Sequence, residues 1–194
     1  MRRKSRGLNF NHRKKKINTG LVKEISIWAG EILLVVLIAV MLVSFVGFRV
    51  TVVGASMSPT LESGQEILVN RFKYKIFSPK QNDLIVFLPN GNEKSHYYIK
   101  RVIAGPGDKV QIKDGLVYVN GEQFSEKAAV SNIENALLAE KEITVGEDEY
   151  FVLGDNRNNS EDSRYASIGN VKKEYIVGKA WFVVSPWGKF GFIK

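Results

Sequence analysis

The sequence predicts a mainly β protein, in which an N-terminal transmembrane helix precedes an extracytoplasmic all-β domain of antiparallel sheets with a small inserted lobe. Three observations lead to this prediction. A long apolar run lies near the N-terminus, a basic tail precedes it, and short β-rich runs separated by Gly, Asn and Asp follow it. We therefore expect a cytoplasmic tail at 1–27, an anchor helix at 28–48 and an outer domain at 49–194.

The tail accounts for the net charge of +8. Residues 1–27 hold nine basic side chains and one acidic one, whereas residues 28–194 hold 19 of each. The folded domain is therefore close to neutral, and nucleic acid is not expected as a partner. Basic residues before a span favour the cytoplasmic side and contact anionic lipid headgroups. We expect a single-pass protein of the plasma membrane with its N-terminus in the cytoplasm.

The anchor is predicted from Ile32–Phe48, which contains no charged residue. A helix of about 20 residues crosses the hydrocarbon core, and Trp28 and Phe48 are suited to its two interfaces. Two other interpretations stay open. Val53-Gly54-Ala55 resembles the cleavage site of a signal peptide, although the apolar run is longer than such peptides usually have. A buried helix of a soluble protein is the least favoured interpretation, because the run is apolar on all faces.

Strand-like runs fill the outer domain. Lys113-Asp114-Gly115 predicts a hairpin between two of them. Residues 126–142 are rich in Ala, Glu and Lys, and we expect a helix or a mobile flap there, within an inserted lobe at about 113–148. The expected strands are Arg49–Val53, Glu66–Phe72, Asp83–Leu88, Tyr97–Ile103, Lys109–Ile112, Leu116–Val119, Glu149–Leu153, Tyr175–Val177 and Ala180–Val184.

The residue types of the outer domain restrict the chemistry. The chain has no cysteine, which excludes disulfides, zinc–thiolate sites and a cysteine nucleophile. The outer domain has one histidine, His96, and no His or carboxylate cluster, so we expect no metal and no cofactor. An enzyme built from this sequence needs a serine or threonine nucleophile. Its base would be His96, a carboxylate or a lysine.

Lys100 is the candidate lysine base. Strand alternation places Tyr98, Lys100 and Val102 on one face, where burial would lower the pKa of the amine and leave it neutral at working pH. The alternative is an edge-strand lysine whose amine stays in water. His96 follows a polar loop, which favours a solvated side chain.

Three stretches carry the remaining polar chemistry: "GASMSPTL" at 54–61, "YYIKRVIAGPGDK" at 97–109 and "GDNRNNSEDSR" at 154–164. The third lacks the glycine and ligand spacing of a calcium loop. In this order behind an anchor, the three resemble bacterial type I signal peptidase, the membrane-bound serine endopeptidase family (S26) that removes signal peptides from exported proteins. The resemblance covers essentially the whole chain, and the single anchor resembles the Gram-positive form.

The resemblance implies a role for each motif residue. Ser56, directly before the methionine, matches the nucleophile, and Ser58 occupies a variable position. Lys100 matches the general base and Ser160 the serine that orients its amine. Asp162 and Arg164 match a structural ion pair, which Asp155 supports. The backbone N–H of Ser56 would donate to the oxyanion, whereas Gly54 stands where some relatives carry a second donor, so the Gly54 region leaves that donor open.

The resemblance also implies the substrate and the partners. The family cleaves after small residues in an Ala-x-Ala pattern, which a shallow pocket would select, and an extended substrate would pair with the strand before Ser56. Preprotein signal peptides, the lipid bilayer and the secretion translocon are the expected partners. The pocket walls, or alternatively ordinary core residues, are Val50, Val52, Tyr98 and Ile99. Most C-terminal aromatics are expected in the β-core and some in the outer leaflet: Trp181, Phe182, Trp187, Phe190 and Phe192.

Two other functions stay open. A related Ser-Lys protease with a specialised substrate would share the same dyad. A non-catalytic anchored domain that binds exported chains would not need Ser56, Lys100 and Ser160 together. A peptidase of this specificity could also cut its own chain after Ala55 and so detach the outer domain.

Overall fold

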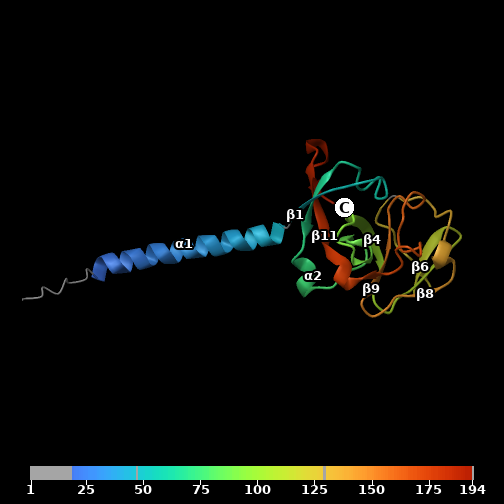
Figure 1. The fold of residues 1–194 in the computed structure, drawn as a ribbon, viewed down its shortest axis with the longest axis horizontal. Helices are drawn as coiled ribbons and strands as arrows, with labels where there is room; N and C mark the ends of the chain where they lie inside the picture. The colour runs from blue at the N-terminus through green and yellow to red at the C-terminus, as the bar shows by residue number, and fades with distance from the viewer. Residues whose placement is uncertain (1–18, 47, 129, 194) are drawn as a thin grey trace, which may run out of the picture. The chain divides into compact units, whose positions relative to one another are not determined.

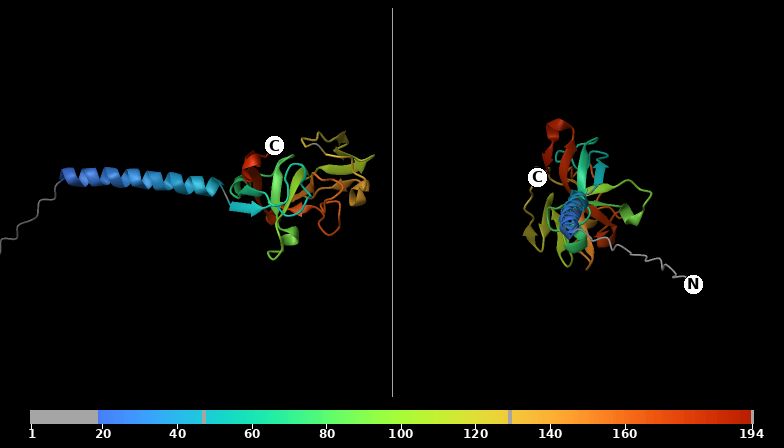
Figure 2. Two further views of the ribbon diagram at one scale, coloured as in Figure 1. Left: turned by 90° about the horizontal axis from the view of Figure 1, so that it is seen from above. Right: turned by 90° about the vertical axis from the view of Figure 1, so that its left-hand side faces the viewer.

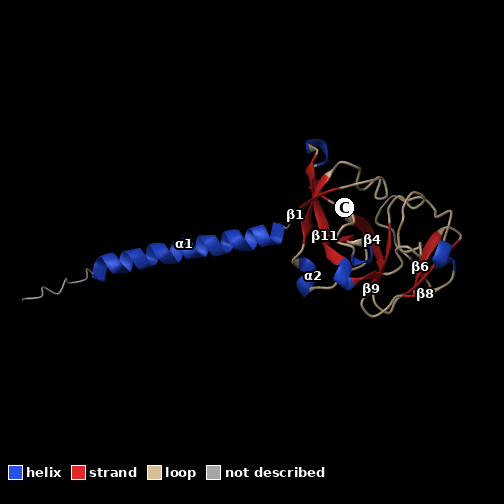
Figure 3. Ribbon diagram, viewed as in Figure 1, coloured by secondary structure: helices blue, strands red, loops and turns tan. Residues whose placement is uncertain are grey.

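The computed structural model describes residues 19–46, 48–128 and 130–193, so most of the basic tail lies outside the described residues. The chain divides into two compact units, residues 1–41 and 42–194. The predicted fold class is confirmed: an apolar helix is followed by mainly antiparallel sheets (Figures 1 and 3).

The N-terminal helix α1 covers Thr19–Val46. It begins earlier than the expected 28–48, and Phe48, the expected end of the anchor, instead begins strand β1. Within α1, Gly20–Met41 is long and apolar enough to cross a membrane, and its side chains are exposed. A core helix of a soluble protein would bury such a surface.

The outer unit contains two antiparallel sheets (Figure 2). The larger has the strand order β1-β2-β11-β3-β4-β9-β10, with β12 paired to β11, and the smaller has the order β7-β6-β5-β8. The larger sheet contains β1 Phe48–Thr51, β2 Glu66–Asn70, β3 Leu84–Phe87, β4 Tyr98–Ala104, β9 Glu149–Leu153, β10 Val171–Lys172, β11 Ile176–Ser185 and β12 Gly191–Phe192. The smaller contains β5 Lys109–Lys113, β6 Leu116–Val119, β7 Glu122–Gln123 and β8 Ile143–Thr144.

Short helical turns connect these strands. They are α2 Lys73–Ile76 and the 3₁₀ turns Pro89–Gly91, Leu137–Glu140, Lys173–Tyr175 and Trp187–Lys189. The hairpin expected at 113–115 is confirmed, because Lys113 pairs with Leu116 and leaves Asp114 and Gly115 as a two-residue turn. Both have positive φ, 51° and 76°, as a type I′ turn requires.

Two expectations about the strands are wrong. The two strands expected at Tyr175–Val177 and Ala180–Val184 are one strand, β11, which begins at Ile176, because Tyr175 belongs to the preceding 3₁₀ turn. The pairing of β11 is irregular at Ile176/Gly178 and Ala180/Phe182, which bends the strand without breaking it. The strand expected at Glu66–Phe72 ends at Asn70, whose side-chain Oδ1 accepts hydrogen bonds from the N–H groups of Phe72 and Lys73. This Asx-type turn starts α2.

Of the two expectations for 126–142, a helix or a mobile flap, the helix is wrong. Only Leu137–Glu140 is helical, as a 3₁₀ turn, and the other described residues of this stretch form loops and bends that contact the loop at 154–164. Its Ala, Glu and Lys content favours a helix locally, but tertiary contacts prevail. Ile133 is buried in the core beneath the smaller sheet, and Arg157 holds Glu126 through two hydrogen bonds of 2.6 and 2.7 Å.

Candidate active site

A tight turn after β1 presents Ser56. Met57 and Leu61 are buried and anchor the turn in the core, and the N–H of Leu61 donates to the Met57 carbonyl over 2.9 Å. Ser56 lies between these anchors and the exposed Val53 and is half-buried. The apolar core therefore fixes the backbone of the serine while its hydroxyl stays accessible.

Gly54 has a positive φ of 84°. A residue with a Cβ is strained in that conformation, so the backbone at this position favours glycine. The Gly54 N–H donates to Ser63 Oγ over 3.2 Å.

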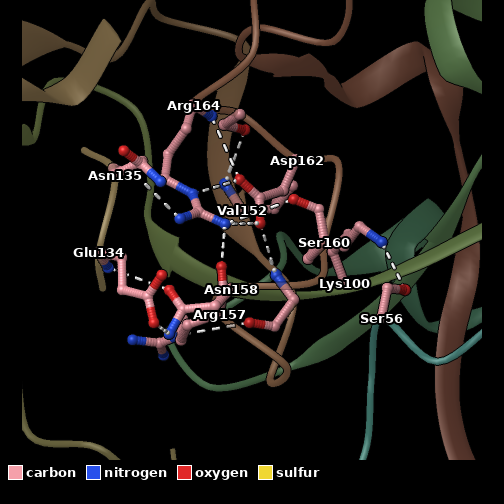
Figure 4. A network of polar contacts seen from close by, with 12 residues as sticks. Ser56, Lys100, Glu134, Asn135, Val152, Arg157, Asn158, Ser160, Asp162 and Arg164 are labelled. Carbon is pink, nitrogen blue, oxygen red and sulfur yellow. Dashed lines mark hydrogen bonds and ion pairs between the residues drawn. The ribbon is translucent and has the colours of Figure 1, made fainter. Parts of the chain in front are cut away.

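Lys100 lies on β4 with its side chain turned toward Ser56 (Figure 4). Its Nζ donates a hydrogen bond of 2.7 Å to Ser56 Oγ and lies 5.3 Å from the ring centroid of Tyr98. The residue is only 3% exposed. Burial is the main cause that lowers the lysine pKa from 10.5 to about 8, against the opposing effect of the Asp162 and Glu161 carboxylates.

Ser160 is buried beside this pair (Figure 4), and its Oγ has no hydrogen-bond partner among the residues that the structure describes. The space around it is small. A Cβ on Gly154 would lie 2.1 Å from Ser160 Oγ and 2.5 Å from the Ser56 carbonyl oxygen. Glycine at 154 is therefore what allows the loop to approach the serine turn this closely.

The loop at 154–164 is held by buried charge pairs. Arg164 donates two hydrogen bonds to Asp162, from Nε to Oδ1 over 2.8 Å and from Nη2 to Oδ2 over 3.0 Å. Asp162 Oδ2 also accepts a hydrogen bond from the Gly154 N–H. Both side chains are almost fully buried. A buried charge that loses its partner destabilises the fold strongly. The Asp162–Arg164 pair therefore fixes the shape of the loop that carries Ser160.

Arg101 and Asp155 form a second buried pair, with contacts of 2.8 and 2.7 Å. The Thr60 hydroxyl donates to the same carboxylate over 2.5 Å, so one group joins β4, the loop and the serine turn. The loop also reaches Ser56 directly, because the Asn156 N–H donates to the Ser56 carbonyl over 3.0 Å. Sequence reasoning missed Arg101, Thr60 and Asn156; the adjacency of Arg101 to Lys100 was the one available signal.

A cleft lies beside the hydrogen-bonded pair of Ser56 and Lys100. Three of the four expected pocket walls line it, namely Val52, Tyr98 and Ile99, together with Ser56 and Lys100. Val50 does not line the cleft and is buried in the core.

Two polar side chains add to the cleft wall. His96 is exposed there, and Glu161 accepts hydrogen bonds from the Ser167 and Tyr98 hydroxyls over 2.7 and 3.4 Å. The hydrogen bond to the Ser56 hydroxyl comes from Lys100 and not from His96.

The C-terminal aromatics differ from the expectation that most pack in the core. Trp187, Phe190 and Phe192 are 86%, 52% and 72% exposed. They pack on one another and on Phe182, with Trp187 stacked on Phe190 at 5.4 Å between ring centroids. They form an exposed aromatic patch at the β11–β12 hairpin.

Comparison with known proteins gives a consistent result. Residues 25–187 match the family described as "Signal peptidase, peptidase S26". Signal peptidase I T of Bacillus subtilis (strain 168) is 35% identical over 183 residues, which cover 91% of each chain. Signal peptidase IB of Staphylococcus aureus (strain COL) is 34% identical over 185 residues, covering 87% of this chain and 93% of the relative.

A solved structure shares this similarity. The crystal structure of a signal peptidase I from Enterococcus faecalis V583 is 35% identical, with a TM-score of 0.42, and the match covers 53% of this chain and 97% of that one.

Proposed function

The chain belongs to the signal peptidase family of peptidase S26, and we propose that Ser56 and Lys100 are the nucleophile and general base of its reaction. Its activity is that of a signal peptidase I: it is a serine endopeptidase that cleaves signal peptides from exported preproteins. The observation that carries the assignment is the 2.7 Å separation of Ser56 Oγ and the buried Lys100 Nζ.

The proposed reaction starts with the neutral amine of Lys100. Ser56 Oγ–H donates its proton to Nζ as the oxygen attacks the scissile carbonyl carbon, and the resulting ammonium then protonates the leaving amine. In the second half, Lys100 takes a proton from water, the water attacks the acyl-enzyme ester, and the proton returns to Ser56 Oγ. A pKa of about 8 leaves roughly a tenth of the amine neutral at pH 7, so both protonation states are available.

Neighbouring groups support this cycle. We assign Ser160 to orienting the amine, because its buried hydroxyl has no other partner among the described residues. The backbone N–H of Ser56 is our first oxyanion donor. Asp155, Asp162 and Arg164 act as positioning residues, since they hold the loop through the buried pairs described above. We propose that the second hydrogen-bond donor to the oxyanion lies in the Gly54 region.

The cleft supports a preference for small side chains. Val52, Tyr98 and Ile99 form its walls beside Ser56, and we propose that they restrict the residues before the scissile bond to the Ala-x-Ala pattern. An extended signal peptide would add along β1, the terminal strand of the larger sheet.

The family assignment and the single apolar helix fit a single-pass membrane anchor. We propose that the tail is cytoplasmic and the catalytic unit extracytoplasmic, because of the basic residues before the span. In this orientation the cleft would meet preproteins as they leave the translocon, with the exposed aromatics at 187–192 against the outer leaflet.

A cleavage assay tests the dyad. Full-length enzyme in detergent is incubated with several preproteins that carry Ala-x-Ala sites, alongside Ser56→Ala, Lys100→Met and Ser58→Ala. We expect the first two to lose at least about a thousandfold in kcat/KM and Ser58→Ala to keep its activity. Persistent cleavage by Ser56→Ala or Lys100→Met contradicts the dyad. Cleavage of only one preprotein would instead favour a specialised processing peptidase.

A further inference from the structure

The turn that leaves β2 carries an exposed basic and apolar segment. Residues 71–80 read "RFKYKIFSPK" and contain four basic residues, and no acidic residue occurs between Arg71 and Asp83. Ile76 and Phe77, at the end of α2, are 61% and 62% exposed. Exposed apolar side chains interleaved with lysine and arginine are typical of surfaces that lie on anionic bilayers. We refer to residues 71–80 as the α2 segment.

The exposure of these side chains is fixed by the fold. Tyr74 is the buried residue of α2, and its hydroxyl donates to Asp83 over 2.9 Å. The same carboxylate accepts from the Lys80 N–H and pairs with Lys179. The contacts of Tyr74 and Lys80 with Asp83 hold one face of the segment against the sheet, and Ile76 and Phe77 lie on its exposed side.

The sheet register places this segment at one particular end of the outer unit. Strand β1 is antiparallel to β2, and Phe48, the first residue of β1, pairs with Val69 near the end of β2. The chain leaving β2 therefore runs past the start of β1. Arg71 confirms this placement, since its guanidinium carbon lies 4.6 Å from the ring centroid of Phe48.

The start of β1 is tied to the membrane by chain connectivity alone. Helix α1 ends at Val46, one residue before Gly47, and β1 begins at Phe48. Phe48 follows Met41, the last residue of the apolar span, by seven residues, which reach at most about 25 Å even when fully extended. Chain connectivity therefore limits how far the Phe48 end of the sheet can lie from the bilayer.

We propose that the α2 segment is a docking surface for anionic phospholipid, with Ile76 and Phe77 entering the interface and Arg71, Lys75 and Lys80 contacting headgroup phosphates. It is distinct from the aromatic hairpin at 187–192. In the β11–β2 register Ser185 pairs with Glu66, and Lys179 pairs with Asn70, so the hairpin and α2 leave opposite ends of β2. The docked segment would fix the tilt of the outer unit on the membrane.

Fluorescent labelling of the full chain tests this proposal. Because the chain has no cysteine, Phe77→Cys and Gln123→Cys each give one site for an environment-sensitive NBD dye. Gln123 lies on β7 of the smaller sheet and is exposed. Both proteins are reconstituted into phosphatidylcholine vesicles with and without 30% phosphatidylglycerol, which have the same composition in both leaflets. Nitroxide-labelled lipid is added as a quencher.

We expect blue-shifted and lipid-quenched emission at 77 in the phosphatidylglycerol vesicles only, and solvent-like emission at 123 in both. Arg71→Gln/Lys75→Gln should lower the ratio of docked to undocked protein about thirtyfold. The matched pair Lys113→Gln/Lys141→Gln, on the smaller sheet and its neighbouring turn, should not. Solvent-like emission at 77 in anionic vesicles overturns the proposal. A blue shift at 77 that nitroxide lipid does not quench points to a protein contact and overturns it as well.

Discussion

Replacement of Lys100 by methionine should abolish cleavage and stabilise the fold. Lys100 is only 3% exposed, and this burial lowers the pKa of its amine from 10.5 to about 8. Each pKa unit corresponds to about 1.36 kcal/mol, so carrying an ammonium at this site costs the folded state roughly 3 kcal/mol. Methionine has a similar length and no charge to bury. Loss of the hydrogen bond to Ser56 offsets about 1 kcal/mol of this gain. The free energy of unfolding of Lys100→Met should therefore exceed that of the parent by about 2 kcal/mol.

The sign of the effect sets its pH dependence. Because the pKa of Lys100 is lower in the folded than in the unfolded chain, protonation favours unfolding. The cost is fully present below pH 8 and fades as the pH rises toward 10.5. The stabilisation by Lys100→Met should therefore be largest at pH 6 to 7 and fall by about 1 to 2 kcal/mol at pH 9.5.

Urea unfolding of the full-length proteins in nonionic detergent measures this difference. Trp181 reports on the outer unit, because its indole Nε1 is buried. Lys113→Met, on the exposed end of β5, is the matched control and should change the free energy of unfolding by less than about 0.5 kcal/mol. Equal stability of Lys100→Met and the parent at pH 7, or a larger gain at pH 9.5 than at pH 7, would refute this account of a desolvated lysine.

Three further results are expected. The kcat/KM of the parent should rise with pH around a midpoint near 8. Glu161→Gln should move that midpoint to lower pH at low salt, because the Glu161 carboxylate raises the pKa of Lys100. A pH–rate profile of the variant that coincides with that of the parent would contradict this expectation. Gly154→Ala should lose activity and stability together, since its Cβ would lie 2.5 Å from the Ser56 carbonyl oxygen. Normal turnover of a preprotein by this variant would contradict the prediction, because it would mean that the loop moves to make room for the methyl group. Asp155→Asn should cost about 3 to 5 kcal/mol in thermal or urea unfolding, because Arg101 is left buried without its counter-charge; a loss below 1 kcal/mol would contradict the pairing.

The sequence by itself determined the elements that depend on neighbouring residues. The apolar run at 32–48 predicted the anchor helix, and Asp114-Gly115 predicted the turn between β5 and β6. Strand alternation placed Lys100 on the face of Tyr98, and their 5.3 Å contact confirms it. These features follow from backbone sterics and from the two-residue period of a strand, so a short window of sequence contains the needed information.

Only the tertiary structure decided how remote groups combine. The pairing of Arg101 with Asp155, the two hydrogen bonds that hold Glu126 to Arg157 and the crowding around Gly154 each join segments that are far apart in the chain. The hydrogen bonds of Glu126 and the burial of Ile133 hold the described residues of 126–142 as a loop with one 3₁₀ turn in place of the expected helix. The lowered pKa of Lys100 also needed the fold, because desolvation depends on every element packed around the amine. The motifs pointed to Ser56 and Lys100, but only packing brought the turn that carries Ser56, strand β4 and the loop at 154–164 to one place.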